Sequence, residues 1–180
     1  MSLRNCLLNL QTKRLFFTPP RQKDASDAYS HKREIESTIF TGGITQKSWP
    51  DFKKEYLYNC INQEIKWKDI YSVILKDTDK YIGYCGFQYC NTLEGIEILY
   101  GYSSKYWGKG YAFEAAQALL SYGFMELGFE NILAAVNPKN PASEAILHKI
   151  GMKFIGNIEW PDQGVVKKYG LSHEQFLIDI

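Results

Sequence analysis

The stretch Tyr102–Glu114, with the sequence YSSKYWGKGYAFE, decides how this 180-residue chain folds. Apolar and β-prone residues precede it, and small and apolar residues at helical spacing follow it, so a strand ends and a helix begins inside it. Gly108 and Gly110 stand at that junction, where glycine lets the backbone come close to a ligand. Free N–H groups at a helix start, together with the helix dipole, bind anions. The stretch therefore predicts a site for a phosphate or pyrophosphate.

Two common nucleotide-binding motifs do not fit this stretch. A Walker loop needs Gly-x-x-x-x-Gly-Lys followed by Ser or Thr, which the sequence lacks. A dinucleotide fingerprint needs a third glycine where Phe113 stands, and an acidic residue after the next strand, where Val136 is followed by Asn137. An ordinary glycine turn, with Lys109 in solvent, is the alternative to an anion site.

The pattern around this stretch predicts a mixed sheet with helices on both faces, an α/β (α+β) fold, in one domain over residues 1–180. An antiparallel half precedes the stretch and an alternating half follows it. The expected strands are residues 12–18, 70–75, 81–89, 95–102, 131–136, 152–160 and 165–171. The expected helices are residues 22–40, a segment that Ser48 caps, 110–127 and 140–150.

Composition excludes several classes of protein. The chain has 21 Lys+Arg against 20 Asp+Glu, a net charge of +1, which disfavours a direct nucleic-acid binder. With 45% hydrophobic and 23% charged residues it is not a disordered chain. No apolar run reaches the ~18 residues of a membrane span, and the first ten residues lack the pattern of a secretory signal. The four cysteines match no zinc or redox spacing, so we expect reduced thiols, no metal and a cytoplasmic protein.

The segment Trp107–Ala112, followed by Glu114-Ala115, resembles the acetyl-CoA pyrophosphate loop of the GNAT N-acetyltransferases. That family carries Gln/Arg-x-x-Gly-x-Gly/Ala, and here Gly110 and Ala112 stand at its glycine and its closing small residue. Trp107 takes the place of Gln/Arg, a departure that is familiar in the Rim-type branch of ribosomal-protein N-terminal acetyltransferases and their relatives. We call Trp107–Ala112 the glycine loop.

Four further segments resemble that branch in the same order along the chain. They are Thr12–Leu15, Ile82–Phe87, Glu97-Ile98, and Asn137–Ser143 with the later Gly151-Met152-Lys153-Phe154. The resemblance covers nearly the whole chain. It implies the GNAT fold with a central, mostly antiparallel, twisted sheet. It also implies an acetyl-CoA-dependent N-acetyltransferase in which an amine attacks the thioester directly.

The resemblance assigns the cofactor-binding residues. Backbone N–H groups of the glycine loop would hold the pyrophosphate, and Asn137 and Asn140 would stand beside the pantetheine arm. The loop residues are Trp107, Gly108, Lys109, Gly110, Tyr111 and Ala112. From the sequence itself, Asn140 before Pro141 is a good helix N-cap, so we expect it to serve both as cap and as cofactor contact.

Three residues are candidates for the chemistry. By resemblance, a backbone N–H near Tyr102, where the central strand splays from its neighbour, polarises the thioester carbonyl. Resemblance also makes Ser143 the proton donor to the leaving thiolate, although a first-turn serine can simply satisfy a helix end. A buried carboxylate with a raised pKa suits the base; Glu97 is preferred to Glu94, and water stays open.

The acceptor stays open at the level of sequence. A protein N-terminus, a polyamine, an amino acid or an aminoglycoside would each supply a primary amine, and one fold can host any of them. No membrane partner is expected, and a homodimer is compatible with the sequence. The alternative function is a catalytically silent acyl-CoA-binding sensor, which would keep the loop and Asn140 but lack a working base.

Overall fold

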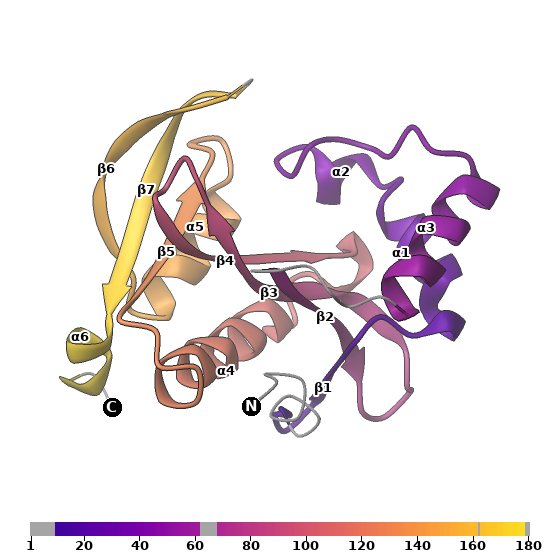
Figure 1. Ribbon diagram of the computed structural model, residues 1–180, viewed down its shortest axis with the longest axis horizontal. Helices are drawn as coiled ribbons and strands as arrows, with labels where there is room; N and C mark the ends of the chain where they lie inside the picture. The colour runs from indigo at the N-terminus through magenta and orange to yellow at the C-terminus, as the bar shows by residue number, and fades with distance from the viewer. Residues whose placement is uncertain (1–9, 62–67, 162, 179–180) are drawn as a thin grey trace.

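A computed structural model describes residues 10–61, 68–161 and 163–178 of the chain (Figure 1). Its strands form one seven-stranded sheet in the order β1-β2-β3-β4-β5-β7-β6. The strands are β1 (Leu15–Thr18), β2 (Lys68–Leu75), β3 (Tyr81–Cys90), β4 (Gly95–Tyr102), β5 (Asn131–Val136), β6 (Lys153–Trp160) and β7 (Gly164–Ser172). The α-helices are α1 (Ala25–His31), α2 (Ile35–Thr38), α3 (Trp49–Ile61), α4 (Tyr111–Met125), α5 (Pro141–Lys149) and α6 (His173–Ile178).

The sheet is antiparallel except at its centre. Strands β1 to β4 form an antiparallel meander, and β7 pairs antiparallel with both β5 and β6. Only β4 and β5 are parallel in the described part of the chain, because α4 carries the chain from the end of one to the start of the other. The predicted mixed, mostly antiparallel α/β sheet is therefore confirmed.

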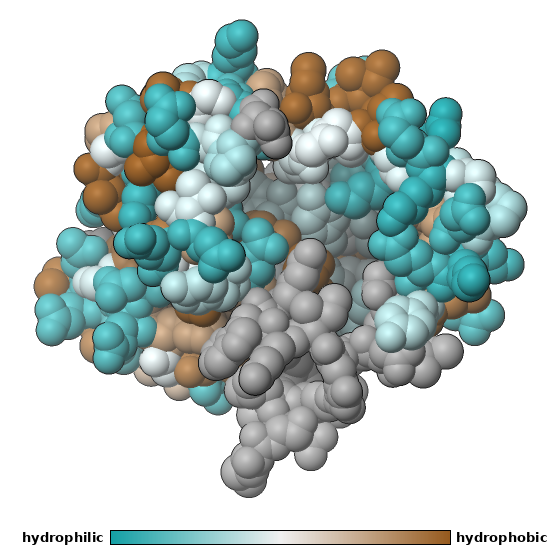
Figure 2. Space-filling model, turned by 45° about the horizontal axis from the view of Figure 1, so that its top comes forward, coloured by the Kyte–Doolittle hydropathy of each residue, from teal (hydrophilic) through white to brown (hydrophobic). Residues whose placement is uncertain are grey.

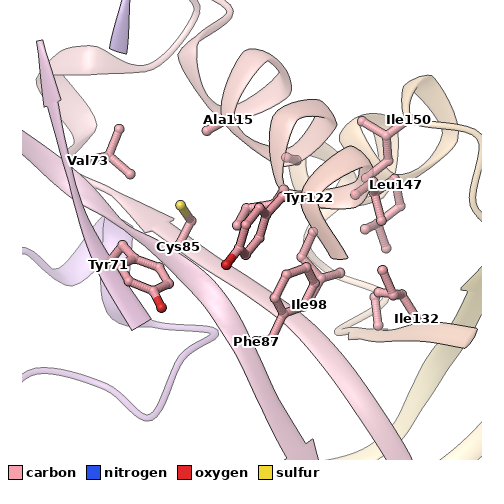
Figure 3. Packing of buried hydrophobic residues seen from close by; sticks show 14 of the residues in the cluster. Tyr71, Val73, Cys85, Phe87, Ile98, Ala115, Tyr122, Ile132, Leu147 and Ile150 are labelled. Carbon is pink, nitrogen blue, oxygen red and sulfur yellow. The ribbon is translucent and has the colours of Figure 1, made fainter. Parts of the chain in front are cut away.

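Helices cover both faces of the sheet, as predicted. Alternate residues of a strand point to opposite faces, so Val73 and Ile74 of β2 separate two groups of contacts. Val73 belongs to a large buried cluster with α4 and α5, whereas Ile74 packs with α1 and α3. Figure 3 shows the first cluster, in which strand residues such as Phe87 and Ile98 point toward Tyr122 of α4 and Leu147 of α5. Apolar burial of this extent supplies the main stabilising free energy of the fold.

The helix predicted over residues 22–40 is wrong in its continuity. The chain forms a 3-10 turn at Gln22–Asp24, then α1, and then a separate short helix α2. The break lies at Glu34, whose backbone is extended with φ −76° and ψ 120°. Its carboxylate accepts hydrogen bonds from Ser103 and Ser104 at the end of β4. A long-range contact that local helix propensity does not contain therefore ends the helix.

A second difference is the C-terminal helix α6, which the sequence prediction omitted. The Ser172 hydroxyl accepts from the backbone N–H of Gln175 at 3.2 Å, and the Gln175 side chain accepts from the Ser172 N–H at 3.1 Å. This reciprocal pair is a capping box, whose Ser-x-x-Gln pattern is legible in the sequence. Phe176 of α6 then packs against Phe124 of α4. In the described residues, no helix has the length and apolarity needed to cross a bilayer.

Candidate active site

A deep cleft of about 950 Å³ runs through the middle of the molecule. Figure 2 shows it as a hollow at the centre of one face, with apolar surface along part of its rim. Its walls come from α2 and the turn after it, from β3 and β4, from the glycine loop, and from α5. Most of the predicted site residues line it, namely Glu97, Tyr102, Trp107, Gly108, Gly110, Tyr111, Ala112, Asn137, Asn140 and Ser143. Distant segments of the sequence thus meet in one cavity.

The cleft opens where β4 and β5 part. Among the described residues, Glu97↔Leu133 is the one register pair between these strands, although β4 continues to Tyr102 and β5 to Val136. In the ladder with β3, the Ser103 N–H bonds the Ile82 carbonyl, so odd-numbered backbone groups of β4 face β3. The N–H groups of Tyr100 and Tyr102 therefore face the side from which β5 has moved away.

The glycine loop connects the end of β4 to α4. A 3-10 turn at Ser104–Tyr106 comes first, and the Trp107 indole N–H then bonds the Tyr102 carbonyl at 2.7 Å. Gly108 and Gly110 have φ of 72° and 77°, the left-handed region that glycine adopts without steric cost. Gly110 is the N-cap of α4 and makes no side-chain cap, so the first N–H groups of the helix stay available to a ligand.

Lys109 is the one predicted loop residue that does not line the cleft. Its ammonium lies over the Tyr106 ring, 5.6 Å from the centroid, and its carbonyl accepts from Arg14 at 2.9 Å. Its backbone thus takes part in the loop, while its side chain lies against the ring of Tyr106, which itself lines the cleft.

The loop is supported from behind by a contact that sequence reasoning missed. Glu114, in the first turn of α4, accepts from the Arg14 side chain at 2.5 Å and from the Thr12 hydroxyl at 2.5 Å. The Arg14 guanidinium also stacks over the Tyr111 ring at 4.4 Å. The segment before β1 is therefore fixed to the start of α4. Arg14 and Glu114 both lie in segments that resemble the family, but they are 100 residues apart, so no local sequence pattern predicts that they pair.

The start of α5 forms the opposite wall. The Asn140 side chain accepts from the Ser143 backbone N–H at 3.1 Å, and Pro141 occupies the first turn, so the predicted N-cap is confirmed. The Asn137 carbonyl accepts from the Asn140 backbone N–H at 2.8 Å. The Asn137 side-chain oxygen accepts from the Lys139 backbone N–H at 3.0 Å. Both asparagines line the cleft while serving the local turn.

Ser143 has a partner that the sequence reasoning did not identify. The Tyr100 hydroxyl of β4 lies 3.0 Å from the Ser143 Oγ and 3.3 Å from its carbonyl oxygen. Burial raises the pKa of Tyr100 to about 12, with the bond to Ser143 opposing the shift. Tyr100 therefore stays a neutral phenol that can donate a proton. The available signal was a tyrosine on the cleft-facing strand, but nothing in the sequence indicated which helix it would meet.

Glu97 lies on the opposite face of β4 from Tyr100, at the floor of the cleft. Glu97 is only 7% exposed, and its carboxylate accepts a hydrogen bond from the Gln88 side-chain amide at 2.7 Å. Burial raises the pKa of Glu97, while hydrogen bonds from Gln88 and Cys90 act in the opposite direction. Glu94, the other carboxylate considered, is exposed in the turn before β4 and does not line the cleft.

The cysteines whose side chains are described lie in the interior of the protein. Cys85 and Cys90 are buried free thiols, and burial raises the pKa of both. Cys6 and the side chain of Cys60 lie outside the described residues. Across residues 10–61, 68–161 and 163–178, no group of three His, Cys, Asp or Glu side chains is placed to hold a metal ion.

Comparison with curated proteins shows related N-acetyltransferases. The chain is 33% identical over 165 residues to "Uncharacterized N-acetyltransferase YoaA" of Bacillus subtilis, covering 89% of this chain and 86% of that one. It is 36% identical over 111 residues to "Uncharacterized N-acetyltransferase p20" of Bacillus licheniformis, covering 61% and 57%. The match to p20 thus spans just over half the length of that relative.

Solved structures share the fold. A GNAT-family acetyltransferase from Bacillus anthracis superposes with a TM-score of 0.77 at 25% identity, covering 92% of this chain and 98% of that one. A spermidine N-acetyltransferase from Vibrio cholerae, in complex with CoA and spermine, gives 0.76 at 17% identity, covering 92% and 99%. The family model described as "Acetyltransferase (GNAT) domain" matches residues 14–153. The glycine loop, the parted strands and these matches together establish that the chain belongs to the GNAT acetyltransferase family.

Proposed function

We propose that this protein is an acetyl-CoA-dependent N-acetyltransferase that transfers an acetyl group to a primary amine. One observation carries the proposal: the cleft brings the glycine loop, the hydrogen-bonded hydroxyls of Tyr100 and Ser143, and the buried carboxylate of Glu97 together around parted strands. Membership of the GNAT family implies acetyl-CoA as co-substrate.

The residues present suit acetyl-CoA. The uncapped start of α4 offers backbone N–H groups to a pyrophosphate, and the positive φ of Gly108 and Gly110 keeps that approach clear of a Cβ. The gap between β4 and β5 leads from this loop past Asn137 and Asn140, which would stand beside the pantetheine arm. Acetyl-CoA would supply the acetyl group as an activated thioester.

We assign polarisation of the thioester carbonyl to backbone N–H groups of β4. Tyr102 is the donor proposed from the sequence, and the alternation of the ladder adds Tyr100, one step nearer to the point of parting. A donor fixed by a sheet ladder needs no reorganisation when charge develops on the oxygen. One such donor is worth ~3–4 kcal/mol in other acyl-transfer enzymes.

We assign the base to Glu97. The ammonium of the acceptor must lose a proton before it attacks, since an α-amine has a pKa near ~8 and a lysine amine near ~10.4. Glu97 is buried at the cleft floor, and its raised pKa brings it closer to neutral pH, where a general base works best. A water between Glu97 and the amine would extend its reach.

We assign protonation of the leaving thiolate to Tyr100 together with Ser143. The two hydroxyls lie 3.0 Å apart on the face of β4 opposite Glu97, at the start of α5. The sequence alone points to Ser143 and not to its partner Tyr100. Because the Tyr100 phenol is neutral and bonded to Ser143, either hydroxyl can donate while the other replenishes its proton.

Solved neighbours suggest two kinds of acceptor. One is titled a "spermidine N-acetyltransferase" and another a "putative ribosomal-protein-serine acetyltransferase", both from Vibrio cholerae and both under 25% identical. They support a small amine and a protein N-terminus, respectively, as acceptors to test, and the second also supports the Rim-type branch. A single domain over residues 1–180, a cytoplasmic location, a homodimer and the absence of nucleic-acid partners stay predictions.

The experiment that tests the proposal is thiol release from acetyl-CoA in the presence of a panel of primary amines and N-terminal peptides. A thermal shift with CoA and with ATP should accompany it. Turnover with at least one amine and stabilisation by CoA are expected. Stabilisation by CoA without turnover on a broad panel favours the acyl-CoA-binding sensor, and stabilisation by ATP alone overturns the proposal.

A further inference from the structure

The short helix α2 and the turn that follows it line the cleft on the side opposite α5 (Figure 1). Glu36, Ser37 and Phe40 of this segment line the cavity, as do Tyr84 and Gln88 of β3. If acetyl-CoA enters beside α5 and the glycine loop, the amine must approach from this side. We call residues 35–42 the acceptor wall.

The acceptor wall is attached to the sheet by the side chain of Glu34. One carboxylate oxygen accepts from the Ser103 hydroxyl at 2.6 Å, and the other accepts from the Ser104 backbone N–H at 2.8 Å. Partial burial of Glu34 opposes its ionisation, but the hydrogen bonds from Ser103 and Ser104 lower its pKa, so it is charged at neutral pH. A charge-assisted, two-oxygen contact of this kind is strong and directional.

The partners of Glu34 belong to the segment that leads into the glycine loop. The Tyr106 N–H bonds the Ser103 carbonyl at 2.9 Å, and the Trp107 N–H bonds the Ser104 carbonyl at 3.0 Å. Trp107 is the first residue of the loop. A continuous series of hydrogen bonds therefore runs from the loop, through the 3-10 turn, to Glu34 and the wall.

Within the described residues, the wall's other backbone bonds are local. The Thr41 and Gly43 N–H groups bond the Thr38 carbonyl, and the Thr38 hydroxyl bonds the Glu34 carbonyl. These bonds shape the turn but do not tie it to β4. Among the described residues, α2 packs against β4, and the Glu34 carboxylate adds the hydrogen bonds that hold the start of the wall to the end of that strand.

We propose that Glu34 is a positioning residue that couples the acceptor wall to the glycine loop, so that CoA binding at the loop orders the acceptor side of the cleft. The proposal rests on the proposed function, since it needs CoA at the loop. A ligand that holds the loop also holds Ser103 and Ser104 in place, so their hydrogen bonds to Glu34 break less often. The mobility of the wall falls as a result. Coupling of this kind is reciprocal, so an ordered wall also favours CoA binding.

Hydrogen exchange of the whole protein with and without CoA tests this coupling. In the wild type, CoA should slow exchange in residues 104–112 and also in residues 35–42, the latter by about 5-fold or more. In Glu34→Ala, protection of the loop should remain while protection of the wall is lost. Ser103→Ala removes one of the two hydrogen bonds to Glu34, so in this variant CoA should protect the wall less than in the wild type. Glu126→Ala, an exposed carboxylate at the far end of α4, should behave as the wild type.

Each other outcome counts against the coupling. Equal protection of the wall in Glu34→Ala and in the wild type, or protection of the loop alone in the wild type, overturns the proposal while leaving CoA binding intact. Absence of CoA protection anywhere in the wild type overturns the proposed function along with it. If Glu34→Ala fails to fold, Ser103→Ala decides, since unchanged wall protection there contradicts the proposal. With an acceptor in hand, Glu34→Ala should raise the acceptor KM more than the acetyl-CoA KM.

Discussion

The buried carboxylate of Glu97 makes a prediction about pH. Because burial raises its pKa, it is protonated over a wider acidic range than an exposed glutamate. A base works only when ionised, so kcat/KM should fall as pH falls through that raised pKa. Glu97→Gln should lose ~10²–10⁴-fold in activity and should no longer show this acidic limb. The pH–rate profiles of both proteins, with the best amine found, measure this.

The stability of the same variant provides the control. A carboxyl whose pKa is raised in the folded state contributes stability below its unfolded pKa and loses it as pH rises through the folded pKa. Ionised Glu97 therefore costs stability at neutral pH, and Glu97→Gln should melt no lower than the wild type at pH 7.

The contradicting outcome concerns the pH–rate profile. If the profile of Glu97→Gln keeps the same acidic limb as the wild type, the base is another group or water.

The pair Tyr100 and Ser143 leads to a second prediction at this scale. Tyr100→Phe and Ser143→Ala each remove one of two bonded hydroxyls, so each should lower kcat by ~10²-fold while changing CoA affinity little. Because the two act as a unit, the double variant should lose much less than the product of the single losses. Steady-state kinetics and CoA titration of the three variants measure this. Wild-type turnover in both single variants would leave the pair structural.

At the scale of elements, Asn140 has two roles that substitution can separate. Asn140→Ala removes the N-cap of α5 and should cost ~1 kcal/mol of stability. Asn140→Asp keeps a capping oxygen at the helix start, so it should restore most of that stability. If the side-chain amide also contacts the pantetheine arm, CoA affinity should stay reduced in Asn140→Asp. Full recovery of CoA affinity in that variant would leave Asn140 a cap alone.

The junction between the glycine loop and α4 gives the prediction with the largest expected effect. Gly110 has φ 77°, so Gly110→Val strains the backbone that should face the pyrophosphate and is expected to abolish CoA binding. Gly128→Val is the matched control, since Gly128 also has positive φ with open space around it but does not line the cleft. Calorimetric titration with CoA compares the two. Equal affinities would contradict the assignment of the loop.

The elements that sequence predicted well are those with local determinants. The strand pattern, the glycines before α4 and the Asn140-Pro141 cap of α5 all depend on residues within one turn or one strand, so their signals are present in the sequence. The break at Glu34 and the contact of Tyr100 with Ser143 depend on residues 69 and 43 positions away. Only the assembled sheet brings those pairs together. For this reason the sequence predicts one continuous helix where the structure has α1 and α2, and it indicates Ser143 but not its partner Tyr100.

At the scale of the whole molecule, one apolar cluster joins α4 and α5 to the sheet that forms the cleft (Figure 3). Leu119 of α4 has 0% exposure within it, so Leu119→Ala should cost ~2–5 kcal/mol of unfolding free energy. Leu177→Ala, at a residue 52% exposed, should stay within ~0.5 kcal/mol of the wild type. Urea unfolding followed by circular dichroism measures both. A similar loss in both variants would contradict the assignment of the core.

The most direct test of the proposed function is detection of the acetylated amine by mass spectrometry after incubation with acetyl-CoA and the acceptor panel. Wild-type protein should produce an acetylated primary amine together with free CoA. Gly110→Val should produce neither above the uncatalysed background, while Gly128→Val should match the wild type. If the wild type acetylates no primary amine on the panel although CoA binds, or if Gly110→Val works as well as the wild type, the proposed acetyl transfer through this cleft is contradicted.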